Sequence, residues 1–117
     1  MGGRGVWPCL VFLACGCIED QGDYEHARAD AECRELERCE LGFFESEYRD
    51  LEDCIDDREE HIGDADDELD DADCLYDPEQ AAFCVQKVQS MSCLEWAESG
   101  NGNKACDLVW DCSEANR

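Results

Sequence analysis

Apolar residues recur at helical intervals along much of this chain. A first stripe within residues 27–41 consists of Ala29, Cys33, Leu36 and Cys39. Steps of three and four residues place side chains on one face of a helix, and Gly42 follows as a common helix stop. We therefore predict a helix over residues 27–41.

A second stripe alternates steps of four and three through residues 44–62. Its members are Phe44, Tyr48, Leu51, Ile55, Arg58 and Ile62, of which only the arginine is polar. This pattern is typical of an amphipathic helix, which we expect to end at Gly63. Residues 64–73 are mostly acidic and predict a frayed helix or a mobile acidic loop.

The next helix has the clearest start signal in the sequence. Asp77 is suited to the N-cap, Pro78 to the first helical position and Gln80 to the third. We predict that this helix covers residues 78–97 and that a last, short helix covers 104–112. We therefore expect a helical hairpin over 27–62, joined by the acidic connector to a second helical pair over 78–112.

Several large apolar side chains, most of them aromatic, divide into two groups. Phe83, Met91, Trp96 and Trp110 have helical spacing and are expected in the core. Phe43 and Phe44 are adjacent, so both cannot face one core. One of these two rings is expected to be exposed, where it could contact a partner.

The N-terminus has the features of an export signal. Arg4 precedes nine apolar residues, 6–14, which are followed by Cys15, Gly16 and Cys17. A basic start, a short apolar run and small residues describe a secretory signal, and the run is too short to span a bilayer, which takes roughly 20 residues. We interpret residues 1–16 as a lipoprotein-type signal peptide, with lipid (palmitate among its acyl chains) on Cys17 or, alternatively, on Cys15.

The number of cysteines favours Cys17 as the lipidated residue. Lipidation there leaves an even number in the mature chain: Cys33, Cys39, Cys54, Cys74, Cys84, Cys93, Cys106 and Cys112. Lipidation of Cys15 would leave Cys17 as an odd thiol, which exported proteins seldom keep. A cleaved signal without any lipid is the other alternative.

We expect an acidic tether over 17–26, a cysteine-rich domain over 27–112 and a tail over 113–117.

The eight remaining cysteines predict four disulfides. No C-x-x-C pair is present, which argues against zinc sites and thioredoxin-like redox chemistry. Cysteines six or nine residues apart on one helix are too distant to pair, so each must reach another element. Symmetry about the predicted turns suggests one of the 105 possible pairings: Cys33–Cys54, Cys39–Cys74, Cys84–Cys112 and Cys93–Cys106.

The predicted fold class is an all-α, disulfide-stapled domain of two helical hairpins joined by an acidic connector.

Charge limits the partners that this chain can have. It carries 32 acidic residues against nine lysines and arginines, a formal net charge of −23. Such a surface repels nucleic acid and anionic lipid headgroups and favours cations or basic proteins. We therefore expect no nucleic-acid partner.

The acidic residues also raise the possibility of calcium binding. The candidate ligands are Asp64, Asp66, Glu68, Asp70, Asp71 and Asp73. The EF-hand pattern fails, because Leu69 stands where glycine is needed and Leu75 where the bidentate glutamate is needed. At most, the sequence predicts weak and diffuse Ca²⁺ binding, and no other cofactor.

No catalytic motif is present in the sequence. The nucleophile-elbow, zinc-protease and phosphate-loop patterns do not occur, and His26 and His61 lie in polar surroundings, as surface histidines do. We expect no enzymatic activity.

Two segments resemble the small cysteine-rich lipoproteins of myxobacterial-type Gram-negative bacteria. The first is residues 13–17, followed by an acidic stretch. The second, within residues 74–112, comprises Tyr76, Asp77, Pro78, Ala82, Cys84, Cys93, Leu94, Cys106, Val109 and Cys112. Such proteins lie at the surface or in the periplasm and have no assigned activity.

The sequence thus favours an exported, lipid-anchored, non-enzymatic protein. It would act as a structural or partner-binding module of the envelope, at the outer membrane or cell surface rather than the inner membrane. Its expected contacts are the membrane, through the lipid, and an envelope protein or other basic partner. The alternative function is the binding or buffering of divalent cations.

Overall fold

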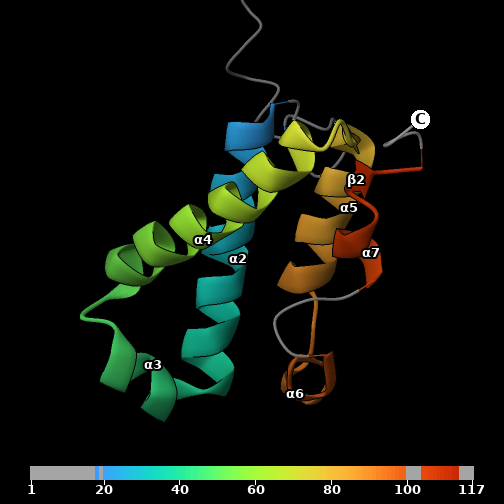
Figure 1. The fold of residues 1–117 in the computed structure, drawn as a ribbon. Helices are drawn as coiled ribbons and strands as arrows, with labels where there is room; N and C mark the ends of the chain where they lie inside the picture. The colour runs from blue at the N-terminus through green and yellow to red at the C-terminus, as the bar shows by residue number, and fades with distance from the viewer. Residues whose placement is uncertain (1–17, 19, 100–103, 114–117) are drawn as a thin grey trace, which may run out of the picture.

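A computed structural model describes residues 18, 20–99 and 104–113 as a small all-α domain with one short two-stranded ladder (Figure 1). Its elements in chain order are α2 (Gln21–Cys39), α3 (Leu41–Glu47), α4 (Leu51–Asp71), β1 (Leu75–Tyr76), α5 (Pro78–Gln89), α6 (Cys93–Ser99), α7 (Lys104–Asp107) and β2 (Trp110–Asp111). The all-α, disulfide-stapled fold class is confirmed.

Helix α2 begins earlier than the sequence pattern predicts. The Asp20 side chain accepts a hydrogen bond from the Asp23 backbone N–H and caps the helix at Gln21. Tyr24, in the first turn, is completely buried, so packing holds this turn against the core. The acidic tether predicted over 17–26 is therefore wrong for residues 21–26, which are helical.

The chain turns at Glu40, not at Gly42. Glu40 has φ −137° and ψ 56°, which ends α2 and begins α3, so that Gly42 lies inside α3. A second break follows at Tyr48, and the Asp50 side chain caps α4 by accepting from the Asp53 N–H. The single helix predicted over 44–62 is thus two helices.

Helix α4 continues through Gly63 and most of the acidic segment, as far as Asp71. A Cβ atom at Gly63 would lie 3.2 Å from the Glu25 carboxylate on α2, so this glycine makes room for a neighbouring side chain and does not stop the helix. Asp73 follows with φ 67°, a left-handed conformation that aspartate tolerates better than most residues. The acidic connector is therefore mainly the last two turns of a helix.

The second half begins as predicted, because the Asp77 side chain accepts from the N–H groups of Glu79 and Gln80. Helix α5 then ends at Gln89, and α6 begins at Cys93 after a reciprocal cap between Ser92 and Glu95. The single helix predicted over 78–97 is therefore two helices. The helix predicted over 104–112 is one turn, α7, followed by β2.

Helix α2 is the centre of the molecule. It packs against α4 on one side and α5 on the other, while α6 lies against its C-terminal end (Figure 1). The two halves are thus not separate hairpins joined by a connector, because α2 belongs to both interfaces.

The short ladder pairs Tyr76 with Trp110 and closes the end of the domain where α2 begins. In the described part of the chain, no helix is long and apolar enough to cross a membrane.

Most of the predicted core residues are buried. Trp96 is 3% exposed, and Met91 and Trp110 are each 9% exposed. Phe83 departs from the prediction, since it is 48% exposed. Phe44 is 4% exposed and Phe43 50%, as expected for two adjacent aromatic rings at one core.

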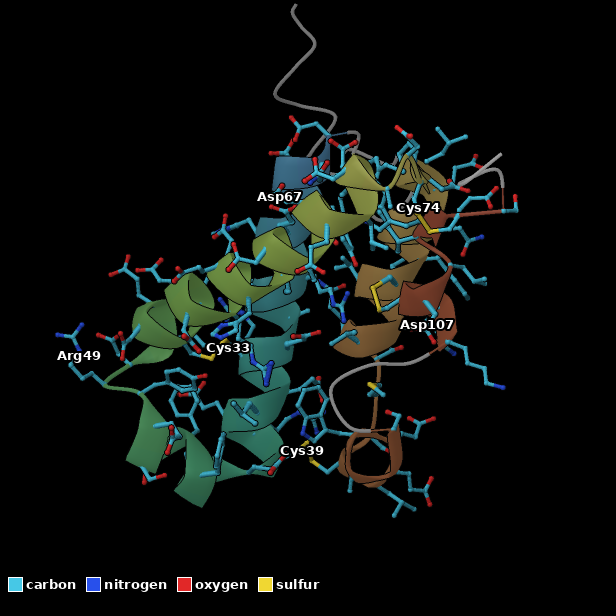
Figure 2. The ribbon with its side chains drawn as sticks, in the orientation of Figure 1. Cys33, Cys39, Arg49, Asp67, Cys74 and Asp107 are labelled. Atoms are coloured by element: carbon cyan, nitrogen blue, oxygen red, sulfur yellow. A yellow bond between two sulfur atoms is a disulfide. The ribbon has the colours of Figure 1, made fainter. Side chains whose placement is uncertain are left out.

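Four disulfides join the helices, and Figure 2 shows their sulfur atoms among the side chains. Cys33–Cys54 joins α2 to α4, as the symmetry about the first turn predicts. The other three predicted pairs, Cys39–Cys74, Cys84–Cys112 and Cys93–Cys106, are wrong. The observed bridges are Cys39–Cys93, Cys74–Cys112 and Cys84–Cys106.

The error has a structural cause. The pairing by symmetry assumed that residues 78–112 form a simple hairpin, with inner and outer bridges. The chain instead breaks after α5, so α6 carries Cys93 to the end of α2, where it meets Cys39. Cys106 then reaches α5 through α7, and the ladder brings Cys112 beside Cys74.

Candidate functional site

A buried ion-pair network lies between α2 and α4. Glu32 is 2% exposed and accepts from Arg28 Nε at 2.7 Å and from Arg58 Nη1 at 3.2 Å. The two arginines come from different helices, so the carboxylate joins α2 to α4. A carboxylate with two guanidinium partners is compensated in charge, which makes this cluster a structural connection.

Tyr24 extends the network to α5. Its hydroxyl accepts from Arg28 Nη1 at 2.8 Å and lies 3.7 Å from Cys84 Sγ. Since Cys84 is in a disulfide and has no proton, the hydroxyl is the donor in that contact. Burial raises the pKa of Tyr24 above its ordinary value, against the lowering effect of Arg28. The phenol therefore stays protonated and cannot serve as a base near neutral pH.

Asp66 is the most perturbed acid in the described part of the chain. It is 4% exposed and accepts from Trp110 Nε1 at 3.1 Å through Oδ1. Burial, followed by hydrogen bonding and repulsion from Glu25, raises its pKa from 3.8 to about 7. Its second oxygen, Oδ2, is buried and has no hydrogen-bond partner, and hydrogen bonding with Glu25 favours the protonated form of Asp66.

A cavity of about 200 Å³ lies beside these groups. Its lining includes Glu32, Arg58, Asp66 and the exposed His61. The buried acids and bases of its wall already pair with one another or with Trp110, and His61 pairs with Asp57 outside it, which leaves no activated nucleophile next to a base. The arrangement serves packing better than acid–base chemistry.

The predicted calcium ligands do not converge. Asp66 faces the interior, whereas Asp64, Glu68, Asp70, Asp71 and Asp73 are exposed. They lie around the axis of α4 and its end, and consecutive helical residues point about 100° apart. Among the described residues, no group of three or more His, Cys, Asp or Glu side chains is placed to hold a metal ion.

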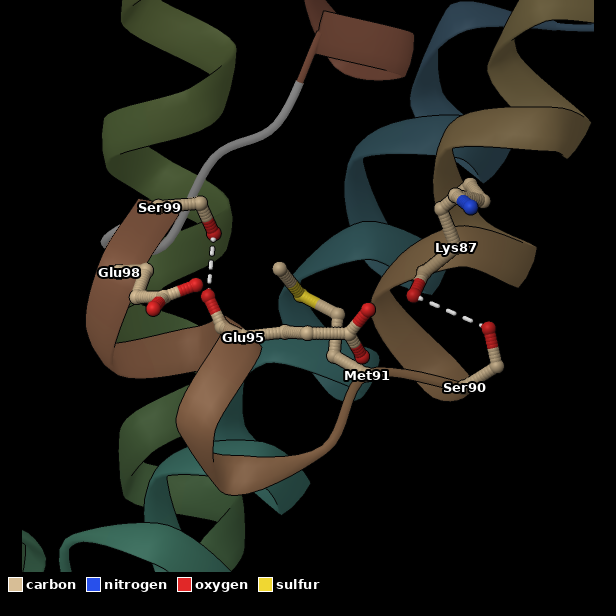
Figure 3. Close-up of a pocket in the computed structure, with 6 residues that line it drawn as sticks. All are labelled: Lys87, Ser90, Met91, Glu95, Glu98 and Ser99. Carbon is tan, nitrogen blue, oxygen red and sulfur yellow. Dashed lines mark hydrogen bonds between the residues drawn. The ribbon is translucent and has the colours of Figure 1, made fainter.

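A hollow of about 500 Å³ lies between the C-terminal end of α5 and α6 (Figure 3). Its polar groups have local roles: Ser90 donates to the Lys87 carbonyl, Ser99 donates to the Glu95 carbonyl, and Glu95 caps α6. The hydrogen bond from the Ser92 N–H lowers the pKa of Glu95. These side chains shape the helix ends and offer no catalytic pair.

A second groove, which we call the distal groove, lies where α2 and α3 face α6. Its volume is about 480 Å³, with Glu40 and Arg58 as its polar members. The remaining lining is apolar: Leu36, Cys39, Phe43, Cys93, Trp96 and Ala97. An apolar depression that carries few polar groups is the usual form of a binding site.

One exposed aromatic ring lies in the distal groove, that of Phe43, which is 50% exposed. The sequence identified the Phe43–Phe44 pair but not the groove, because Trp96 reaches it only through the unexpected Cys39–Cys93 bridge. This groove is the strongest candidate for a functional site.

The predicted lipidation residues, Cys17 and Cys15, lie outside the described residues. The residue that follows Cys17 is informative, since Ile18 is 3% exposed and its carbonyl accepts from the Tyr76 hydroxyl at 3.1 Å. Ile18 is thus packed on the domain at the end where α2 begins.

Comparison with known proteins gives no relative: no family model, no curated protein and no solved structure matches this chain.

Proposed function

We propose that this chain is an exported, lipid-anchored protein without enzymatic activity, whose disulfide-stapled domain binds a partner in the cell envelope. The pairing of the eight cysteines after Cys17 carries the proposal. Disulfides persist in oxidising compartments and are rare in the cytosol, which fits the signal-like residues 1–16. The distal groove supports the binding role, because it offers exposed apolar surface without catalytic groups.

The anchor would lie close to the folded domain. Only Ile18 and two further residues separate Cys17 from the start of α2, and Ile18 is packed against Tyr76. A lipid on Cys17 would therefore hold the end formed by α2, β1 and β2 near the bilayer. The outer membrane or cell surface is the location that we propose.

Cation buffering remains the second candidate function. Eleven carboxylates occupy residues 56–73, and their density favours weak association with divalent ions. The exposed acids of α4 do not share one coordination sphere, so a selective, high-affinity site is not proposed.

Replacement of the two candidate lipidation residues tests the proposal. The native chain should label with radioactive palmitate and sediment with membranes, and Cys17→Ala should abolish both. Cys15→Ala, the matched control, should retain both. A native chain that is unlabelled and fully soluble, with free thiols, would refute the proposal.

A further inference from the structure

The distal groove lies at the opposite end of α2 from the anchored end. Ile18 packs where α2 begins, whereas Cys39 and Phe43 lie where it ends (Figure 1). Nineteen residues of helix span about 28 Å at 1.5 Å per residue. On the proposed function, therefore, the groove points away from the membrane that holds the lipid.

Covalent and polar contacts hold the two walls of the groove together. The Cys39–Cys93 disulfide joins the end of α2 to α6. Across the same junction, Trp96 Nε1 donates to Glu40, and Arg38 Nη2 donates to the Met91 carbonyl at 2.7 Å. A preformed groove loses little conformational entropy on binding, so this one is suited to hold a ligand.

The segments that form the groove are acidic. Residues 37–47 contain four glutamates and one arginine, whereas the two glutamates of α6, Glu95 and Glu98, line the other hollow. Arg38 is already bound to Glu35 and the Met91 carbonyl, and Arg58 is bound to Glu32. The α3 side of the groove is therefore negatively charged, which complements a cationic ligand.

We propose that the distal groove binds a basic peptide segment of another envelope protein, with one large apolar side chain inserted between α3 and α6. The inference rests on the proposed partner-binding function and names the class of partner. A second copy of this chain fits poorly, because each copy carries a net charge of −23 and the two would repel. The apolar side chain would contact Phe43 and Trp96, while flanking lysines or arginines would face the glutamates of α3.

Titration with synthetic peptides, followed by two-dimensional ¹H–¹⁵N spectra of the oxidised full chain, tests this proposal. The probe has one tryptophan between two pairs of lysines. Two controls have serine for the tryptophan, or glutamates for the lysines. The probe should shift the amide signals of residues 36–44 and 93–97 saturably, whereas each control should bind at least tenfold more weakly.

Exposed residues supply matched variants that should keep the fold. Phe43→Ser should weaken binding of the probe at least fivefold. Leu108→Ser changes an exposed leucine elsewhere, at 59% exposure, and should leave affinity unchanged. Glu45→Gln with Glu47→Gln should weaken binding more than Asp67→Asn with Asp70→Asn on α4.

Three results would overturn the proposal: no saturable shift at the groove up to millimolar probe, equal binding of the serine control, or shifts spread along α4. The latter two would indicate diffuse attraction to the acidic surface. None of them bears on the lipid or the bridges, which palmitate labelling tests separately. Conversely, an unlipidated chain that binds the probe at the groove would refute the anchor and leave the binding site intact.

Discussion

Trp110 donates its indole N–H to Asp66, 44 residues earlier in the chain, at 3.1 Å. The bond holds β2 against α4, and the Cys74–Cys112 bridge joins the residues that follow these two elements. Tyr76 lies between the two halves, with its ring 5.5 Å from Trp110 and 6.0 Å from Tyr24. The start of α2, the end of α4 and the ladder are therefore one connected unit.

Because Asp66 is buried beside Glu25, this unit should respond to pH. The folded chain holds the Asp66 proton up to about pH 7, whereas the unfolded chain releases it near pH 3.8. A group whose pKa is raised on folding stabilises the folded protein fully when the pH is below the pKa of the unfolded chain. This stabilisation is lost as the pH rises through the pKa of the folded chain. The Asp66 contribution should therefore fall between about pH 4 and pH 7.

Asp66→Asn should remove this pH dependence of stability. Asparagine can accept from Trp110 and donate to Glu25 at any pH, so the variant should match the native protein below pH 4 and exceed it by up to about 4 kcal/mol at pH 8. The measurement is the free energy of unfolding in urea across this pH range. The facing groups are Tyr24, Glu25 and Arg28 on α2, Tyr76 on β1 and Trp110 on β2. When Glu25→Gln is added to both proteins, the difference in free energy of unfolding between Asp66→Asn and native Asp66 should become smaller. If the difference between Asp66→Asn and the native protein does not change with pH, Asp66 does not take up a proton on folding.

The Glu32 network gives a prediction about stability. Glu32→Ala leaves Arg28 and Arg58 without their buried partner and should lower the free energy of unfolding by about 3–5 kcal/mol. Arg34→Ala removes only an exposed pair with Asp30 and should cost less than about 1 kcal/mol. Thermal and urea unfolding of both variants compare the two. Similar losses would show that the buried network does not hold α2 to α4.

A peptide map of the non-reduced protein tests the arrangement of α6. Digestion should release one disulfide-linked pair that contains Cys39 and Cys93, and a separate pair that contains Cys33 and Cys54. Removal of Cys39 and Cys93 together, as alanines, should lower stability by about 2–4 kcal/mol and broaden the spectrum of residues 93–99. A Cys39–Cys74 peptide in the native protein would contradict the position of α6.

Calcium should act on this protein through charge alone. At millimolar concentration, Ca²⁺ and Mg²⁺ should raise the melting temperature by similar amounts, since the exposed acids of α4 share no single site and screening relieves their repulsion. Differential scanning calorimetry with each ion measures this. A selective calcium effect that Asp64→Asn or Asp71→Asn abolishes would instead support the cation-binding function.

Local signals in the sequence predicted the parts of the fold that depend on neighbouring residues. The Asp77–Pro78 start is where the structure has it, because the cap requires only the residues that follow. The Cys33–Cys54 bridge also follows from local geometry, since the two cysteines lie at nearly equal distances along the chain from α3, which connects α2 to α4. That Phe43 is exposed while Phe44 is buried can be predicted from the spacing of residues along one helix.

The errors arose where tertiary contacts outweigh local preference. Gly63 would ordinarily end a helix, yet here it accommodates Glu25 from α2. The first turn of α2 has little apolar periodicity, but burial of Tyr24 and the Asp20 cap hold it in place. The break before α6 depends on its contact with the end of α2, which no sequence interval reveals. The distal groove was missed for the same reason.

The intact mass of the native protein, from a membrane fraction, tests the lipid anchor and the disulfides in one measurement. Thiols are alkylated in one sample before reduction and in another after it. We expect a diacyl or triacyl adduct on Cys17, no alkylation before reduction and eight alkylated cysteines afterwards. An unmodified N-terminus with thiols that react without reduction would contradict both the exported location and the four bridges.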